Sequence, residues 1–316
     1  MTFNQTEPAR SFLVRYWIYQ RERFPLFQTG LLIAAFTFSA ASYSRICRGA
    51  DGFIPWRFFL GGTFTAIALF LLFRLFDEFK DAEEDAKYRP YRAVPRGLVS
   101  LREIGWGIVI AVLAMLAVNL LLMPVMLLAL LPALGYQLLM WREFFIPKLL
   151  RRHPVAYLVT HMAVMPMIDF YTTGLDWLNA AGILPPGLPL FLLVTFLNGC
   201  VIEIGRKIRA PQDEEHGVET YSVLWGPRRA ALVWLAILTV TGALGLACCR
   251  FAGYALPALP FLLFFWSVGA GFAIRFIHSG RGAKWLETAS GLWTIAMYLT
   301  IGGVPMLMEW SSSLWN

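Results

Sequence analysis

The chain has 316 residues, of which 58% are apolar, 15% aromatic and 15% charged. This composition excludes an ordinary soluble domain and is typical of a polytopic membrane protein. A net charge of +7 could indicate a nucleic-acid partner, but the placement of the basic residues indicates membrane topology instead, so we expect membrane lipids and no nucleic acid as partners.

Nine apolar segments are long enough to cross about 30 Å of hydrocarbon. In chain order they are residues 26–46, 55–76, 104–121, 123–141, 153–173, 186–204, 229–248, 255–277 and 285–308. The third and fourth are separated only by a tight turn at Met123-Pro124. We therefore predict an all-α membrane protein with nine transmembrane helices, which forms one integral-membrane domain over residues 1–316.

The Lys and Arg residues predict the orientation of these helices. All but four of the 27 lie in the N-terminal arm or in alternate connections between segments. The exceptions are Arg45, Arg48, Arg57 and Arg250. Because basic residues gather on the cytoplasmic side, we predict a cytoplasmic N-terminus and a C-terminus on the opposite side. The loops at 77–103 and 205–228 then share the cytoplasmic face.

Six carboxylates stand where the second apolar segment ends. The stretch reads Asp77-Glu78-Phe79-Lys80-Asp81-Ala82-Glu83-Glu84-Asp85. Asp77, Asp81 and Asp85 are spaced i, i+4 and i+8, so on a continuing helix they form one stripe of like charges. Such a stripe suits Mg²⁺, which proteins commonly hold with one or two carboxylates and the oxygens of a phosphorylated substrate. The alternative is a solvated charge run at the membrane surface.

Basic residues follow this stretch and recur in a later short loop. Arg92 lies just downstream and could neutralise the remaining charge of a diphosphate. The loop 147–153 contains Lys148 and Arg151, which could serve the positive-inside signal, contact phosphate, or do both.

A second charged cluster follows the sixth segment, on the same predicted face. It begins with Glu203, which could be a functional acid or an interfacial residue paired with Lys207 one turn later. Arg206 and Arg209 follow, then Asp213, which could equally belong to a solvated turn. Inside the segments, Asp169 is the one acid placed well within an apolar stretch, two turns after His161, and its alternative role is to reach the outer interface.

The first charged stretch resembles a signature of the UbiA superfamily of intramembrane prenyltransferases. The matching residues are Asp77-Glu78-x-x-Asp81-x-x-x-Asp85, then Arg92, Pro95 and Gly97. In that family an Asn-Asp-x-x-Asp-x-x-x-Asp run precedes an Arg-Pro-x-Pro-Ser-Gly-like segment. Its members are nine-helix bundles with a central apolar chamber open to the cytoplasmic side. Two acid-rich motifs, after the second and sixth helices, bind an isoprenoid diphosphate through Mg²⁺.

The resemblance implies roles for individual residues. Those expected to act in catalysis are Asp81, Asp85 and Arg92. The expected metal ligands are Asp81 and Asp85, then Asp77 and Glu78, with Glu203 and Asp213 from the second motif. The expected diphosphate contacts are Arg92, Lys148, Arg151, Arg206, Lys207 and Arg209. The second motif departs from the family, because Arg206 and Arg209 stand where acids are usual; fixed cations could replace one Mg²⁺ there.

The function implied is Mg²⁺-dependent transfer of a prenyl group from an isoprenoid diphosphate to an unidentified acceptor, aromatic or lipid-like. No base for the acceptor stands out in the sequence. One alternative is a terpene cyclase of the same fold, which closes the donor on itself. Another is a membrane carrier or lipid-binding protein without catalytic activity.

Overall fold

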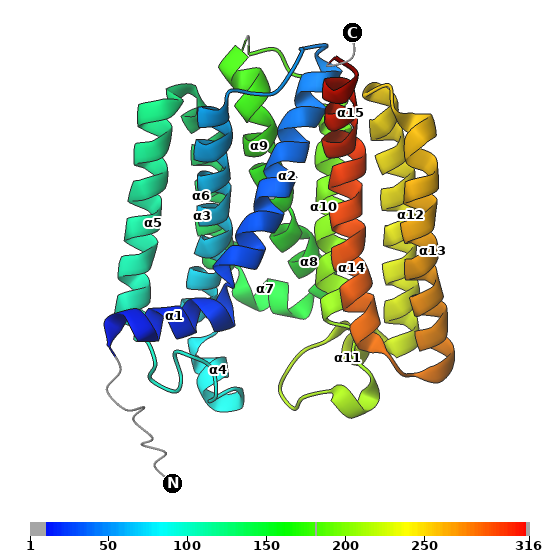
Figure 1. Ribbon diagram of the computed structural model, residues 1–316. Helices are drawn as coiled ribbons and strands as arrows, with labels where there is room; N and C mark the ends of the chain where they lie inside the picture. The colour runs from blue at the N-terminus through cyan, green and yellow to red at the C-terminus, as the bar shows by residue number, and fades with distance from the viewer. Residues whose placement is uncertain (1–10, 181, 314–316) are drawn as a thin grey trace.

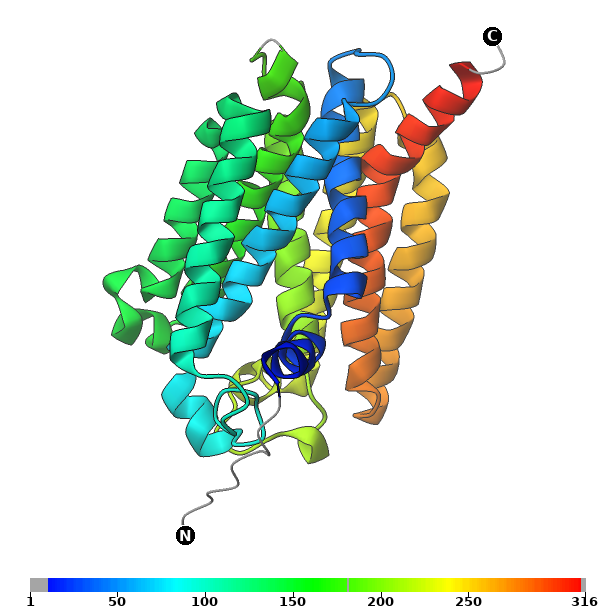
Figure 2. The ribbon, with the colours of Figure 1, turned by 60° about the vertical axis from the view of Figure 1, so that its left-hand side comes forward.

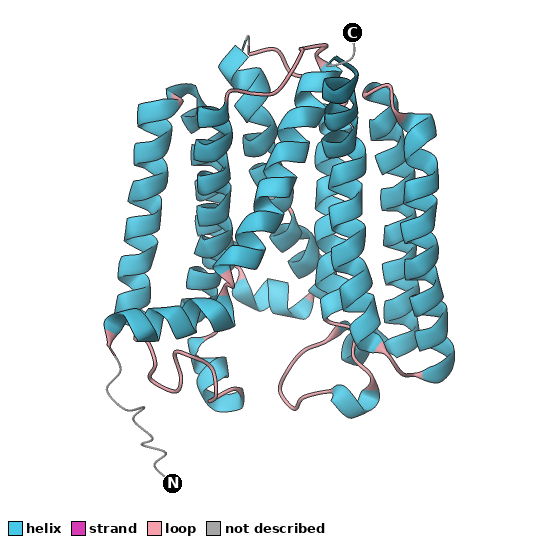
Figure 3. Ribbon diagram, in the orientation of Figure 1, coloured by secondary structure: helices cyan, strands magenta, loops and turns pink. Residues whose placement is uncertain are grey.

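The computed structural model describes residues 11–180 and 182–313, and every regular element in those residues is helical (Figures 1 and 3). Eight stretches of this part of the chain are long and apolar enough to cross a membrane. They are Leu26–Cys47 (α2), Trp56–Lys80 (α3), Leu101–Leu122 (α5), Pro124–Trp141 (η1 and α6), Leu188–Arg206 (α10), Pro227–Phe251 (α12), Ala255–Ser279 (α13) and Ala283–Ser312 (α14, η4 and α15). The expected all-α membrane fold is confirmed.

Two of these stretches are compound. The first joins Pro124–Met126 (η1) to Leu127–Trp141 (α6), and the last joins Ala283–Tyr298 (α14), Leu299–Gly303 (η4) and Val304–Ser313 (α15). The turn expected at Met123-Pro124 lies between α5 and η1, with Pro at the first position of η1, where its missing N–H costs nothing.

The fifth predicted segment, residues 153–173, is two helices rather than one. They are Pro154–Met162 (α8) and Val164–Ala180 (α9), each shorter than a full span. Pro166 explains the break, because its ring clashes with the carbonyl of Met162 four residues earlier and it has no N–H to donate. The count of nine single spanning helices is therefore not confirmed.

The long helices bury two apolar cores. One lies among α3, α5, α6 and α9 and includes Leu72, Met115 and Tyr171. The other lies among α10, α12, α13 and α14 and includes Trp234 and Trp293. Helix α2 packs against α9 on one side and η4 on the other, so it joins the two groups (Figure 1).

One end of the bundle carries short helices, most of which contain charged residues. They are Phe12–Arg23 (α1), Ala82–Tyr88 (α4), Pro147–Arg152 (α7), Pro211–Asp213 (η3) and Tyr221–Trp225 (α11). Figures 1 and 2 show α1 lying across the helix axes at the end where α4 and the segment with α11 also lie. The two charged loops, far apart in sequence, therefore share one end of the molecule, which we call the motif end.

The N-terminal helix α1 is tied to the bundle by ion pairs. Arg15 contacts Glu103, at the start of α5, with 2.6 Å between Nη2 and Oε1. Arg23, at the other end of α1, lies 2.6 Å from the Oε1 of Glu78 on α3, and Tyr19 donates to the same oxygen at 3.3 Å. Glu78 is 2% exposed, so these partners neutralise a buried charge.

This geometry predicts the effect of replacing Glu78. Glu78→Gln leaves the mostly buried Arg23 without its counter-charge, and breaking a buried pair from one side costs about 3–5 kcal/mol. We expect a lower unfolding temperature in detergent and faster trypsin cleavage after Arg21 and Arg23. The exposed Glu84→Gln serves as the matched control. Unchanged stability and cleavage would show that Arg23 does not hold α1.

Candidate active site

The first charged stretch bends where α3 gives way to α4. Asp77 lies in the last turn of α3, Asp81 follows its end, and Asp85 lies on α4. The backbone N–H of Asp81 donates to the carbonyl of Asp77, and that of Asp85 to the carbonyl of Asp81. The three carboxylates therefore stay one turn apart, as the spacing predicted.

Two of the expected metal ligands are already neutralised by arginines. Asp85 is 2% exposed and contacts Arg92 at 2.5 Å and Arg89 at 3.1 Å. Glu78 is bound to Arg23 of α1. Because their oxygens accept these charge-assisted hydrogen bonds, Asp85 and Glu78 stabilise the protein's own loops in this arrangement.

Asp77 and Asp81 are the carboxylates left with weak partners. Arg74 lies 3.6 Å from Asp77, and no hydrogen bond or ion pair of the Asp81 side chain is found among the described residues. Burial, and then the nearby Asp77 carboxylate, raise the pKa of Asp81 to about 6. Two carboxylates one turn apart, one weakly paired and the other without an ion pair among the described residues, form a donor set that fits a divalent ion completed by phosphate oxygens.

The second charged cluster does not form such a set. Glu203 is buried near the end of α10 and is bound by both Arg206 and Lys207, the latter at 2.8 Å. Asp213 is exposed on η3. No group of three or more His, Cys, Asp or Glu side chains able to hold a metal occurs in the described part of the chain. Arg209 is paired with Glu215 at 2.8 Å.

Gly205 allows the end of α10 to reach this position. A Cβ there would lie 2.1 Å from Ser290 Oγ and 2.9 Å from Trp234 Nε1. Trp234 Nε1 donates to Ser290 Oγ at 2.9 Å and to the carbonyl of Val201, so the contact links α12, α14 and α10. Any side chain at 205 would displace Glu203, Arg206 and Lys207.

The two charged clusters approach each other across the motif end. The charges of Arg206 and Asp77 interact electrostatically. Tyr157 of α8 lies between the two helices, with its ring centre 4.8 Å from the Nζ of Lys80 and 5.9 Å from the Nζ of Lys207. The ends of α3 and α10 therefore both lie close to Tyr157 of α8.

Other predicted phosphate contacts lie further out. Lys148 and Arg151 are exposed on α7, and neither forms an ion pair with another described residue. Arg92 is held by Asp85. These three residues share the motif end with Asp77 and Asp81, but their present contacts do not bring them to that pair.

The structure places three side chains around the Nζ of Lys80 that the sequence analysis did not bring together. Tyr157 Oη lies 2.5 Å from this nitrogen, and Glu143 Oε1 and His161 Nε2 each lie 3.4 Å from it. His161 had been noted only as a neighbour of Asp169. The sequence analysis did not single out Glu143 or Tyr157, because Glu143 lies in the short connection after α6 and Tyr157 lies in an apolar stretch.

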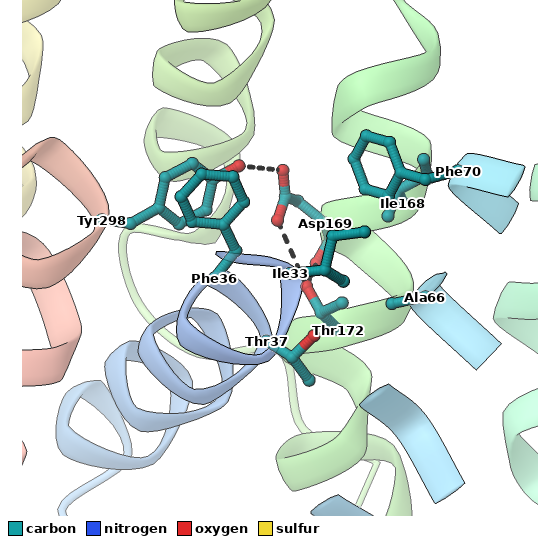
Figure 4. A pocket seen from close by; sticks show the side chains of 9 residues that line it. All are labelled: Ile33, Phe36, Thr37, Ala66, Phe70, Ile168, Asp169, Thr172 and Tyr298. Carbon is teal, nitrogen blue, oxygen red and sulfur yellow. Dashed lines mark hydrogen bonds between the residues drawn. The ribbon is translucent and has the colours of Figure 1, made fainter. Parts of the chain in front are cut away.

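Asp169 is buried in the middle of the bundle rather than exposed at an interface. It is 3% exposed, accepts a hydrogen bond from Tyr298 of α14, and accepts another from Thr172 at 3.2 Å. Figure 4 shows this pair beside a small hollow that Phe36 and Thr37 of α2 also line. The Thr37 hydroxyl has no hydrogen-bond partner among the described residues.

Removing the Tyr298 hydroxyl should destabilise the bundle. Tyr298→Phe removes the shorter of the two hydrogen bonds that Asp169 accepts from Tyr298 and Thr172, and an unsatisfied buried polar group costs about 1–3 kcal/mol. We expect a lower unfolding temperature in detergent, which Asp169→Asn combined with Tyr298→Phe partly restores. If Tyr298→Phe alone unfolds at the same temperature as the parent chain, the hydrogen bond contributes nothing to stability.

An all-helical membrane bundle that holds paired carboxylates and fixed cations at one end is the architecture of an intramembrane prenyltransferase. The model of the UbiA prenyltransferase family matches residues 34–300, so the chain belongs to this family. The resemblance stated from the sequence is confirmed. No curated protein matches the sequence.

Two solved structures share the fold. One is the ligand-free structure of a UbiA homologue from Aeropyrum pernix K1, with a TM-score of 0.65 and 18% identity, covering 89% of this chain and 98% of that one. The other is a digeranylgeranylglyceryl phosphate synthase, with a TM-score of 0.62 and 11% identity, covering 93% and 98%. At these identities the similarity establishes the fold alone.

Proposed function

We propose that this protein is a Mg²⁺-dependent intramembrane prenyltransferase, which moves a prenyl group from an isoprenoid diphosphate to an aromatic or lipid-like acceptor. The observation that carries the proposal is the pair Asp77 and Asp81, of which the first has only the long contact of 3.6 Å with Arg74 and the second has no ion pair among the described residues. Family membership supports the reaction class.

The same geometry supports one divalent ion rather than two. Asp77 and Asp81 would hold it, since their oxygens are the least engaged of the expected ligands in the first charged stretch. Glu203 is occupied by Arg206 and Lys207, so these cations would contact the diphosphate directly. When bound, Mg²⁺ would neutralise part of the diphosphate charge.

The chain's own residues supply the rest of the mechanism. Arg206 and Lys207 stabilise the charge that grows on the leaving diphosphate, because they are fixed beside it before the bond breaks. The apolar side chains of the bundle exclude water from the allylic cation, which water would otherwise capture. Arg92, Lys148 and Arg151 would attract the donor to the motif end through their positive charge.

We place the motif end in the cytoplasm, with the N-terminal helix on that side and the C-terminus opposite, because the basic connections gather there. Residues 1–316 would act as one domain. Labelling single cysteines, introduced near Glu84 and near Gly253, with a membrane-impermeant reagent tests this orientation. Reaction near Glu84 only after the membrane is opened is the expected result, and the reverse pattern contradicts it.

The activity is tested with the purified full chain in lipid nanodiscs, Mg²⁺ and geranyl, farnesyl or geranylgeranyl diphosphate. Mg²⁺-dependent diphosphate release with a prenylated acceptor supports the proposal. A cyclic hydrocarbon or alcohol formed without acceptor would identify a cyclase instead. Donor binding without release at any chain length would identify a carrier.

A further inference from the structure

Lys80 is surrounded by partners from three separate elements. Its ammonium group contacts Tyr157 and His161 of α8, and Glu143 of Glu143–Phe145 (η2). We call Lys80, Glu143, Tyr157 and His161 the lysine cluster. Lys80 lies one turn after Asp77 on α3, because residues three apart on a helix are neighbours, and it directly precedes Asp81 in the chain.

His161 has a defined tautomer in this cluster. Its Nδ1 lies 2.9 Å from the backbone carbonyl oxygen of Tyr157. A carbonyl oxygen can only accept, so Nδ1 carries the hydrogen and Nε2 keeps its lone pair, directed toward Lys80. The ring is therefore a neutral base whose free nitrogen faces an ammonium group.

His161 is buried between the two charged clusters. His161 is the only buried histidine of the four in the chain, all of which are described. Its ring stacks on that of Tyr157, with 3.8 Å between the centres, and Tyr157 lies between Lys80 and Lys207. The base thus stands between the helices that carry the two charged clusters.

A strained turn holds the fourth member in place. Glu143, Phe144 and Phe145 have φ angles of 46°, 52° and 60°, a left-handed conformation that costs on the order of 1–3 kcal/mol per non-glycine residue. The turn directs Glu143 to Lys80 and packs the edge of Phe144 against His161. The second oxygen of Glu143 is buried and has no hydrogen-bond partner among the described residues. The cluster therefore has an open acceptor beside its base.

We propose that the lysine cluster binds the hydroxyl group of the prenyl acceptor and that His161 Nε2 takes its proton; this rests on the proposed function. The bond between C1 of the donor and the bridging oxygen breaks, and its electron pair leaves on the diphosphate. The acceptor oxygen forms a new bond to C1, and its proton moves to Nε2. Atoms and charge balance without any further reagent.

The other members of the cluster orient this step. The Lys80 ammonium stabilises the acceptor oxygen as its O–H bond weakens, because its contacts of 3.4 Å to His161 and Glu143 are long and can be exchanged for a shorter one. Tyr157 is a positioning residue, since its hydroxyl holds Lys80 and its carbonyl holds Nδ1 of His161. Glu143 balances the positive charge.

The test separates donor ionisation from transfer. With geranyl diphosphate labelled at its bridging oxygen, exchange of the label with non-bridging positions reports cleavage at C1, with or without acceptor. Transfer is measured to 4-nitrophenol, phenol and benzyl alcohol, whose hydroxyl groups become progressively less acidic. His161→Gln should reduce transfer to benzyl alcohol by about 10²–10⁴-fold, the usual contribution of a general base. The reduction should shrink toward 4-nitrophenol, and isotope exchange should be unchanged.

The controls make each outcome decisive. His153→Gln, at an exposed position before α8, should behave as the parent chain. His161→Asn provides a second variant, and only variants that unfold at the parent temperature are compared. An equal loss with all three acceptors, or a parallel loss of isotope exchange, would reduce His161 to a structural role and overturn the inference. Isotope exchange without prenylation of any hydroxyl compound would overturn it too. If the parent chain shows neither exchange nor transfer, the proposed function itself fails.

Discussion

Replacing Asp81 by Asn should reduce prenyl transfer by at least about 100-fold. A catalytic divalent ion supplies several kcal/mol of charge stabilisation, and about 1.4 kcal/mol corresponds to a factor of ten in rate. Asp81 is half-buried, follows directly after α3 and has no ion pair among the described residues, so its oxygens are more available than those of Asp77, Glu78 and Asp85. Asn keeps the shape and removes the charge.

The measurement needs a readout that does not depend on turnover. Binding of Mn²⁺, followed by electron paramagnetic resonance in the presence of an unreactive thio-analogue of geranyl diphosphate, should fall together with diphosphate release in both Asp81→Asn and Asp77→Asn. Glu83→Gln is the matched control, because Glu83 lies two residues further on and is exposed. Mg²⁺-dependent release that survives both Asp substitutions would remove the metal assignment.

The fold could be predicted because each membrane span is defined by one contiguous stretch of the sequence. A stretch of about 20 apolar residues suffices to define a span. The predicted segment at 186–204 and α10, Leu188–Arg206, differ by two residues at each end. The prediction of one helix over residues 153–173 was wrong because it considered only the length and the apolar composition of the segment. Pro166 lies within this segment and gives the physical reason for the break, so the sequence alone already contained the information.

The site was less predictable because its electrostatics depends on residues far apart in the chain. Glu78 matches the family pattern, yet its partner Arg23 comes from a helix 55 residues earlier. Lys80 looked like an intervening residue, and its partners Glu143 and Tyr157 come from η2 and α8, which are far from it in the sequence. Sequence spacing identified the carboxylates but could not show which of them are neutralised.

Substitutions in the second charged cluster can show whether the diphosphate is bound there by fixed cations or by a second metal ion. If Arg206 and Lys207 contact the diphosphate, Lys207→Met should weaken donor binding by about ten- to a hundredfold, since a hydrogen bond to a charged group contributes about 1.5–3 kcal/mol. Mn²⁺ binding should remain at one ion per chain. Titration of the fluorescence or heat change with the thio-analogue measures the donor affinity directly.

Glu203→Gln is the partner experiment, because it changes the acid between these cations. A metal ligand at this position would make the substitution as damaging as Asp81→Asn and would remove one Mn²⁺ ion. If Glu203 is instead a counter-ion, Glu203→Gln removes the negative charge that pairs with Arg206 and Lys207. Both cations then become more available to phosphate, so the donor affinity should stay the same or rise. Fixed cations predict two results together. The number of bound Mn²⁺ ions is the same in the parent chain and in Glu203→Gln, and the donor affinity is lower in Lys207→Met. A second metal ion at Glu203 would not give both results.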